Sequence, residues 1–256
     1  MSNTERPLDN MVTNGGFMRI FKSITCVGDS LSSGEFESLK EDGTKGYYDM
    51  FEYSWGQIIG RTIGASVNSF SRGGMTAKEY VESYADLKGF WDEDKKSQAY
   101  IFALGVNDTG SCEKGEVTDI CMEDYTKNGK TFVGYYASII QRYKKMQPRA
   151  KFFLMTMPRD IRIDKPRYEK FLAFNEEIRK MAQLFSDTYL IDLEKYAPVY
   201  DEDFRENYFM GGHLSPAGYV WTADVVMSYI DYIIRHNMKD FKEVGLVKTW
   251  FKPRVN

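Results

Sequence analysis

The sequence predicts an α/β domain with three layers, in which a five-stranded parallel sheet carries helices on both faces. Short runs of β-branched and aromatic residues alternate with longer segments that have apolar residues at three- and four-residue spacing. This alternation is typical of strand-helix-strand units. No repeat, low-complexity segment or linker rich in Pro, Gly and Ser divides the 256 residues, so we expect one domain over residues 1–256.

The strands and helices are expected in a regular order along the chain. The predicted strands are Ser23–Val27, Ser66–Phe70, Ala99–Leu104, Lys151–Thr156 and Thr188–Ile191. The predicted helices are Trp55–Ile63, Thr76–Tyr84, Phe132–Met146, Tyr168–Phe185 and a last one from about Ser215 to His236. Pro216 suits the first position of that last helix, because the amide that proline lacks has no helical partner there. Residues 1–20 are expected to be an N-terminal extension, and 238–256 an apolar tail that packs on the body or on a partner subunit.

Three segments are longer than the connections of a compact α/β domain require: 34–53, 109–130 and 158–167. Each is interpreted as a loop after a strand end, where ligands bind in such sheets. We therefore expect them to form the walls of a substrate site. The first is rich in aromatic side chains, which suit sugar rings and equally suit a loop folded back onto the body.

The composition argues against several classes of protein. The net charge of −3 and short, interrupted lysine clusters give no basic surface for nucleic acid. No apolar run approaches the ~20 residues that span a bilayer, and residues 1–16 lack the apolar centre of a secretory signal, so we expect a cytoplasmic protein without a membrane partner. Three cysteines without a CxxC pattern favour reduced thiols. Two histidines and scattered thiols do not form a metal site, and we expect no metal and no cofactor.

The chemistry is expected at Ser30. Gly28-Asp29-Ser30-Leu31 directly follows the first predicted strand and places a hydroxyl on a tight turn. A serine nucleophile needs a base, and His213, just ahead of the last helix, is the natural partner. His236 lies near the end of that helix and is interpreted as structural.

Two further motifs follow predicted strands, and together the set resembles a known family. Gly73-Gly74-Met75-Thr76 follows the second strand and Gly105-Val106-Asn107-Asp108 follows the third. Over about residues 23–235 the chain resembles the SGNH, or GDSL, hydrolase superfamily, whose fold is a flavodoxin-like sheet. The resemblance implies Ser30 as nucleophile and His213 as base, with the backbone amides of Ser30 and Gly74 and the side chain of Asn107 as the oxyanion hole.

The physical chemistry of ester cleavage agrees with these assignments. Attack on an ester carbonyl places negative charge on its oxygen, and each donor held at that point lowers the barrier by about 3 kcal/mol. Gly74 has no side chain to obstruct its amide, although Gly73 is a near competitor. Asn107 donates two hydrogens without carrying a charge.

One position departs from the family. SGNH enzymes place an aspartate three residues before the histidine, where this chain has Met210. Either a backbone carbonyl such as that of Met210 orients the ring of His213 in a Ser-His dyad, or an acid from the preceding segment does so, or catalysis has been lost. The candidate acids are Asp201, Asp203 and Glu206.

The sequence therefore predicts a serine esterase that forms an acyl-enzyme on Ser30 and hydrolyses it with water activated by His213. The preferred substrate is a small-molecule or oligosaccharide ester, most simply an acetylated sugar, which would make the protein a carbohydrate O-acetylesterase. The alternatives are a lipase, lysophospholipase or thioesterase for longer chains, an acyltransferase, and an inactive glycan-binding homologue. The apolar tail also favours a homo-oligomer.

Overall fold

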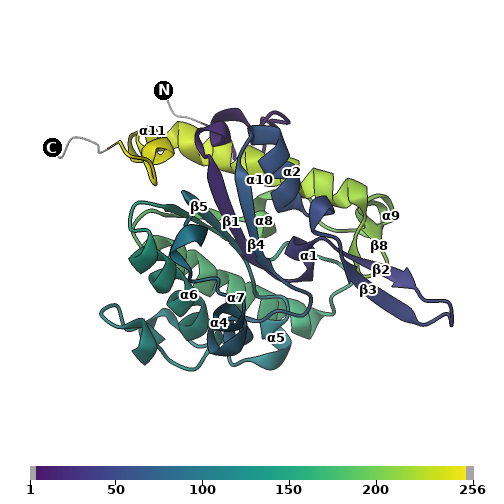
Figure 1. The fold of residues 1–256 in the computed structure, drawn as a ribbon. Helices are drawn as coiled ribbons and strands as arrows, with labels where there is room; N and C mark the ends of the chain where they lie inside the picture. The colour runs from purple at the N-terminus through teal and green to yellow at the C-terminus, as the bar shows by residue number, and fades with distance from the viewer. Residues whose placement is uncertain (1–3, 252–256) are drawn as a thin grey trace.

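The computed structural model describes residues 4–251 and has a central five-stranded parallel sheet (Figure 1). The strand order is β4-β1-β5-β6-β7. The strands are β1 (Ser23–Gly28), β4 (Ser66–Ser71), β5 (Ala99–Ala103), β6 (Lys151–Met155) and β7 (Thr188–Ile191). All five predicted strands are confirmed, each to within one residue at its ends.

Helices cover both faces of the sheet, which confirms the three-layer prediction. One apolar core lies between the sheet and the helices α2 and α10. The other lies between the sheet and α3, α4, α6 and α7 (Figure 1). The helices are α2 (Trp55–Ile63), α3 (Ala77–Glu79), a π-helical segment (Tyr80–Tyr84), α4 (Ala85–Leu87), α6 (Phe132–Met146), α7 (Lys165–Leu184) and α10 (Pro216–His236).

Side-chain caps explain where most of these helices begin. The hydroxyls of Ser54, Thr131 and Ser215 accept backbone N–H groups in the first turns of α2, α6 and α10. α7 begins three residues before the predicted start, because the carboxylate of Asp164 accepts the N–H of Arg167. The cap, rather than the first apolar residue of the pattern, sets this boundary.

The prediction of a loop over 34–53 is wrong, because most of this segment forms a β-hairpin. Strands β2 (Glu35–Leu39) and β3 (Lys45–Asp49) pair antiparallel and extend from the body at the edge where α1 lies (Figure 1). The turn is closed by Asp42, whose carboxylate accepts the N–H and the hydroxyl of Thr44, and by Gly43 with φ of +79°.

The remaining elements are short, and several lie at the same edge as the hairpin. The short helices are α1 (Ser30–Ser33), α5 (Asp108–Ser111), α8 (Leu193–Tyr196), α9 (Glu202–Tyr208) and α11 (Met238–Phe241). The short strands are β8 (Phe209–Met210) and β9 (His213–Leu214). Single 3-10 turns occur at Gly16–Ile20, Phe51–Tyr53, Glu93–Lys95, Val117–Asp119, Tyr125–Lys127 and Val244–Leu246.

The described part of the C-terminal tail packs on the body. Phe241, Val244 and Val247 are buried, and the side chain of Gln98 donates hydrogen bonds to the carbonyls of Gly245 and Val247. Residues 1–3 of the predicted N-terminal extension and 252–256 of the predicted tail lie outside the described residues.

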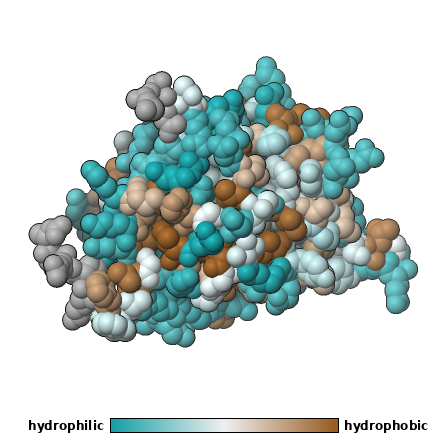
Figure 2. All heavy atoms as spheres, turned by 90° about the horizontal axis from the view of Figure 1, so that it is seen from above, coloured by the Kyte–Doolittle hydropathy of each residue, from teal (hydrophilic) through white to brown (hydrophobic). Residues whose placement is uncertain are grey.

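The outer surface is mixed in character. The face that carries α2 and α10 has apolar residues near its centre with hydrophilic residues around them (Figure 2). Self-association therefore stays a prediction. Within residues 4–251, no helix is long and apolar enough to cross a membrane, and Cys26, Cys112 and Cys121 are free thiols.

Candidate active site

Ser30 is the first residue of α1, on the turn that leaves β1. The carboxylate of Asp29 caps this one-turn helix by accepting the N–H of Leu31 at 3.0 Å. The carbonyl of Ser30 accepts hydrogen bonds from the hydroxyls of Ser33 and Tyr219. The turn is thus held from both sides, and the Ser30 hydroxyl itself makes no hydrogen bond with any residue of the described chain.

The predicted oxyanion residues lie on neighbouring strand ends. Gly28 at the end of β1 is opposite both Ser71 of β4 and Ala103 of β5, which brings the loops after the three strands to one edge of the sheet. Asn107 Nδ2 donates to the carbonyl of Met75 at 3.1 Å. Gly74, with φ of +70°, has open space where a Cβ would lie.

Two buried carboxyl groups lie beneath this edge. Asp29 is 2 % exposed and Asp108 is fully buried. Burial raises the pKa of Asp29 to about 7, against the opposite effect of the Leu31 N–H. Burial likewise raises the pKa of Asp108 to about 6, although its carboxylate accepts the N–H of Ala77. Both therefore have a structural function as acceptors of backbone amides.

His213 lies on β9, which packs against α1 and β2. Its Nε2 is 2.9 Å from Glu35 Oε1, and its Nδ1 is 4.0 Å from Glu37 Oε2. Nδ1 is buried and has no hydrogen-bond partner among the described residues. Burial lowers the pKa of His213, against the opposite effect of Glu37 and Asp49. The structure thus brings His213 beside the Ser30 turn, where the carboxylate of Glu35 is the group paired with its Nε2.

The structure pairs His213 with an acid outside the predicted orienting groups. Met210 is the β-ladder partner of His213, but its carbonyl does not bond the ring, because Nδ1 has no partner and Nε2 faces Glu35. Asp203 and Glu206 are exposed on α9 and make no contact with the imidazole within the described chain. The acids beside His213 come instead from β2, 176 and 178 residues earlier in the sequence.

Sequence reasoning missed Glu35 and Glu37. The signal that could have found them is the alternation Glu35-Phe36-Glu37 before the turn residues Asp42 and Gly43, which is typical of a half-buried hairpin strand. Phe36 packs inward against Tyr219, with ring centroids 5.4 Å apart. The two glutamates therefore share the opposite face of β2.

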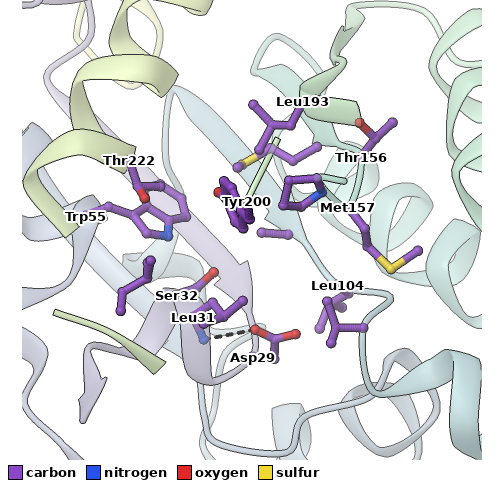
Figure 3. Close-up of a pocket in the computed structure, with 15 residues that line it drawn as sticks. Asp29, Leu31, Ser32, Trp55, Leu104, Thr156, Met157, Leu193, Tyr200 and Thr222 are labelled. Atoms are coloured by element: carbon purple, nitrogen blue, oxygen red, sulfur yellow. Dashed lines mark hydrogen bonds between the residues drawn. The ribbon is translucent and has the colours of Figure 1, made fainter. Parts of the chain in front are cut away.

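A small cavity lies beside the Ser30 turn. Its volume is about 60 Å³, and its lining includes both neighbours of Ser30, Asp29 and Leu31. Figure 3 shows the mostly apolar side chains around it, among them Trp55, Met157 and Tyr200. Such a cavity suits a small apolar group.

A wider groove of about 330 Å³ begins at the same place. Leu31 and Gly212, neighbours of Ser30 and His213, line one part of it. Pro158, Arg162 and Arg167 line another, so the segment 158–167 forms one wall of this groove. The groove can hold the larger part of a substrate outside the cavity.

The other histidine is remote from these features. His236 lies at the end of α10, where its Nδ1 is 2.7 Å from the carbonyl of Tyr232. Within residues 4–251, no group of three or more His, Cys, Asp or Glu side chains could hold a metal ion.

The parallel sheet carries a serine on the turn after β1 and a histidine ahead of the last long helix, α10. This arrangement is typical of ester hydrolases with a three-layer α/β/α fold. The chain matches the model of the GDSL-like lipase/acylhydrolase family over residues 26–221 and belongs to this family. Comparison with curated proteins finds no match.

Solved structures of esterases share the fold at low sequence identity. A family two carbohydrate esterase from Clostridium thermocellum in complex with cellohexaose is 18% identical, with a TM-score of 0.55 over 86% of this chain and 65% of that chain. The acetyl xylan esterase AlAXEase is 17% identical, with a TM-score of 0.53 over 81% of this chain and 99% of that chain. A lipase/acylhydrolase from Enterococcus faecalis is 14% identical, with a TM-score of 0.50 over 83% of this chain and 96% of that chain.

Proposed function

We propose that the protein is a serine esterase that removes short acyl groups, in particular acetyl, from carbohydrates. The Ser30 oxygen attacks the ester carbonyl while its proton moves to His213. The N–H groups of Ser30 and Gly74 and the amide of Asn107 stabilise the oxyanion. The leaving alcohol takes the proton from His213, and water then repeats the sequence to release the acid and free Ser30.

The observation that carries this proposal is the meeting of four distant segments at one edge of the sheet. The loops after β1, β4 and β5 are brought together by strand register, and β9 packs against α1. Catalysis by Ser30 needs the hydroxyl and imidazole to close on one another, and hydrogen bonds of this kind are often long before substrate binds.

The size of the cavity favours a short acyl group. About 10–15 Å³ of such volume holds one water-sized group, so the 60 Å³ cavity beside the Ser30 turn has room for roughly four to six. An acetyl or butyryl group fits, whereas an octanoyl chain does not. The carbohydrate esterases that share the fold support a sugar as the carrier.

The test is hydrolysis of nitrophenyl acetate, butyrate and octanoate, together with release of acetate from acetylated xylo-oligosaccharides. The wild type is expected to prefer acetate, and Ser30→Ala to lose at least about 1,000-fold in kcat. Ser83→Ala, at an exposed serine whose hydroxyl donates to the carbonyl of Glu79, is the matched control. Undiminished turnover by Ser30→Ala refutes the esterase assignment, and an optimum at eight carbons refutes the short-acyl assignment in favour of a lipase or thioesterase.

A glycan-binding protein without catalysis is the second candidate. It is favoured by one observation, that Nε2 of His213 pairs with the carboxylate of Glu35 and that no hydrogen bond joins the imidazole to Ser30 within the described residues. An organophosphonate distinguishes the two, because an activated Ser30 is labelled covalently and an inert one is not. Labelling of the wild type but not of Ser30→Ala supports the esterase.

A further inference from the structure

The hairpin β2–β3 surrounds the imidazole of His213 on several sides. Glu35 and Glu37 of β2 approach its two nitrogens at 2.9 and 4.0 Å. The ring of Tyr47 on β3 packs edge-on against it, with centroids 5.4 Å apart. The side chains of Glu35, Glu37 and His213 are 12–15% exposed, so water screens their interactions only weakly.

We propose that Glu35 is the acid that orients His213, the role for which Met210 offers no side chain. This inference rests on the proposed esterase function. A carboxylate that accepts the Nε2 proton fixes the neutral imidazole as its Nε2–H tautomer. The lone pair then lies on Nδ1, which is buried and has no hydrogen-bond partner within the described residues. Nδ1 is therefore the nitrogen that receives the proton of Ser30.

Glu37 has a different function, because its carboxylate is already engaged. It pairs with Lys45 at 2.6 Å and accepts the N–H of Gly212 at 2.9 Å, and the Lys45 hydrogen bond lowers the pKa of Glu37. Its 4.0 Å distance from Nδ1 is too long for a hydrogen bond. Glu37 thus anchors the turn that carries His213, whereas the one ion pair of the Glu35 carboxylate within the described residues is with His213.

The pairing assists both halves of the reaction. When the Ser30 oxygen bonds to the acyl carbon, its proton moves to Nδ1 and the ring becomes a cation. That cation then lies against the carboxylate of Glu35, an ion pair that exists only while His213 holds the extra proton, so it stabilises the transition state rather than the resting state. When the ester bond breaks, Nδ1 returns the proton to the leaving oxygen.

The pH dependence of this pair is set by several neighbouring groups. Burial and then Asp49 raise the pKa of Glu35, and Arg72 lowers it. The titratable and charged groups that face Glu35 or His213 from the hairpin, α1, the loop after β4 and α10 are Glu37, Lys45, Tyr47, Asp49, Asp29, Arg72 and Tyr219. Protonation of Glu35 at acid pH removes the acceptor for Nε2–H, so activity should fall on the acid side in the wild type.

The test compares Glu35→Gln with the matched variant Glu37→Gln in the full chain. Kinetics on nitrophenyl acetate from pH 5 to 9 give kcat and KM, and nitrogen-15 NMR reports the tautomer of His213. Because the chain has two histidines, His236→Gln assigns the spectrum. Glu35→Gln is expected to lower kcat roughly 100-fold or more with KM within a few-fold, and to reduce the Nε2–H tautomer. Glu37→Gln should keep that tautomer, and Glu35→Asp should recover part of the lost rate.

Two results overturn the inference. One is a Glu35→Gln variant that is as active as the wild type or more active. Glu35 would then not assist His213 in catalysis. The other is a change of tautomer in Glu37→Gln with none in Glu35→Gln. Failure of the esterase function is recognised separately, by full activity in Ser30→Ala, and the NMR result on Glu35 holds in either case.

Discussion

The carboxyl group of Asp29 should make the stability of the protein depend on pH. Its pKa is raised by burial from 3.8 to about 7. Between these values the unfolded chain has lost the proton and the folded protein still holds it, so the free energy of unfolding falls as the pH rises from about 4 to about 7 and is level above. A shift of about three units corresponds to about 4 kcal/mol.

Asp29→Asn removes this dependence and keeps the helix cap. The amide oxygen of asparagine can still accept the N–H of Leu31, but the side chain does not ionise. The measurement is urea unfolding of both proteins at pH 4.5 and pH 8, with the exposed Asp94→Asn as control. Groups that do not interact with Asp29 contribute equally to both proteins and cancel. Between pH 4.5 and pH 8, the free energy of unfolding of the wild type should fall by roughly 3 kcal/mol more than that of Asp29→Asn. An equal fall in both proteins would refute the reasoning.

Two further variants test the packing. Gln98→Ala should lower the free energy of unfolding by about 2–4 kcal/mol, because Gln98 is 3% exposed and donates hydrogen bonds to the carbonyls of Gly245 and Val247. Hydrogen exchange should show that the tail opens first. Unchanged protection of the tail amides would contradict the prediction. Tyr143→Phe should lower the free energy of unfolding by about 1–3 kcal/mol, because the hydroxyl of Tyr80 then loses the 2.6 Å hydrogen bond that joins the two buried phenols. An unchanged midpoint of thermal unfolding would contradict this prediction.

The sheet and its helices could be predicted because burial on both faces leaves a simple pattern. β6 consists of Lys151 and four large apolar residues up to Met155, all of them buried, and β5 is similar. Such runs are typical of parallel strands. The hairpin lacks this signal, since β2 buries one residue, Phe36, and exposes or half-buries the rest.

From the sequence, only those candidate site residues that directly follow a strand could be placed together. Ser30, Gly74 and Asn107 each follow a strand of the parallel sheet, and the carboxyl ends of such strands meet at one edge. The partner of His213 depends instead on contact between β9 and a strand far away in the sequence. The expectation of an orienting group at or near Met210 follows from the family pattern, and no local feature of that segment excludes it.

Ser30 and Glu35 are close together along the chain, so one short segment positions both of them. Gly34 turns the chain from α1 directly into β2, with φ of +87°, and a Cβ there would lie 2.5 Å from the carbonyl oxygen of Met50. Only glycine fits this turn. The proposed nucleophile Ser30 and the proposed acid Glu35 therefore lie on one short segment, whereas the proposed base His213 lies on β9, which Glu37 holds to the hairpin through the N–H of Gly212. A displacement of β9 relative to this segment would change the distance from the imidazole to Ser30, so the hydrogen bond between Glu37 and Gly212 helps to fix the distance on which the proposed proton transfer depends.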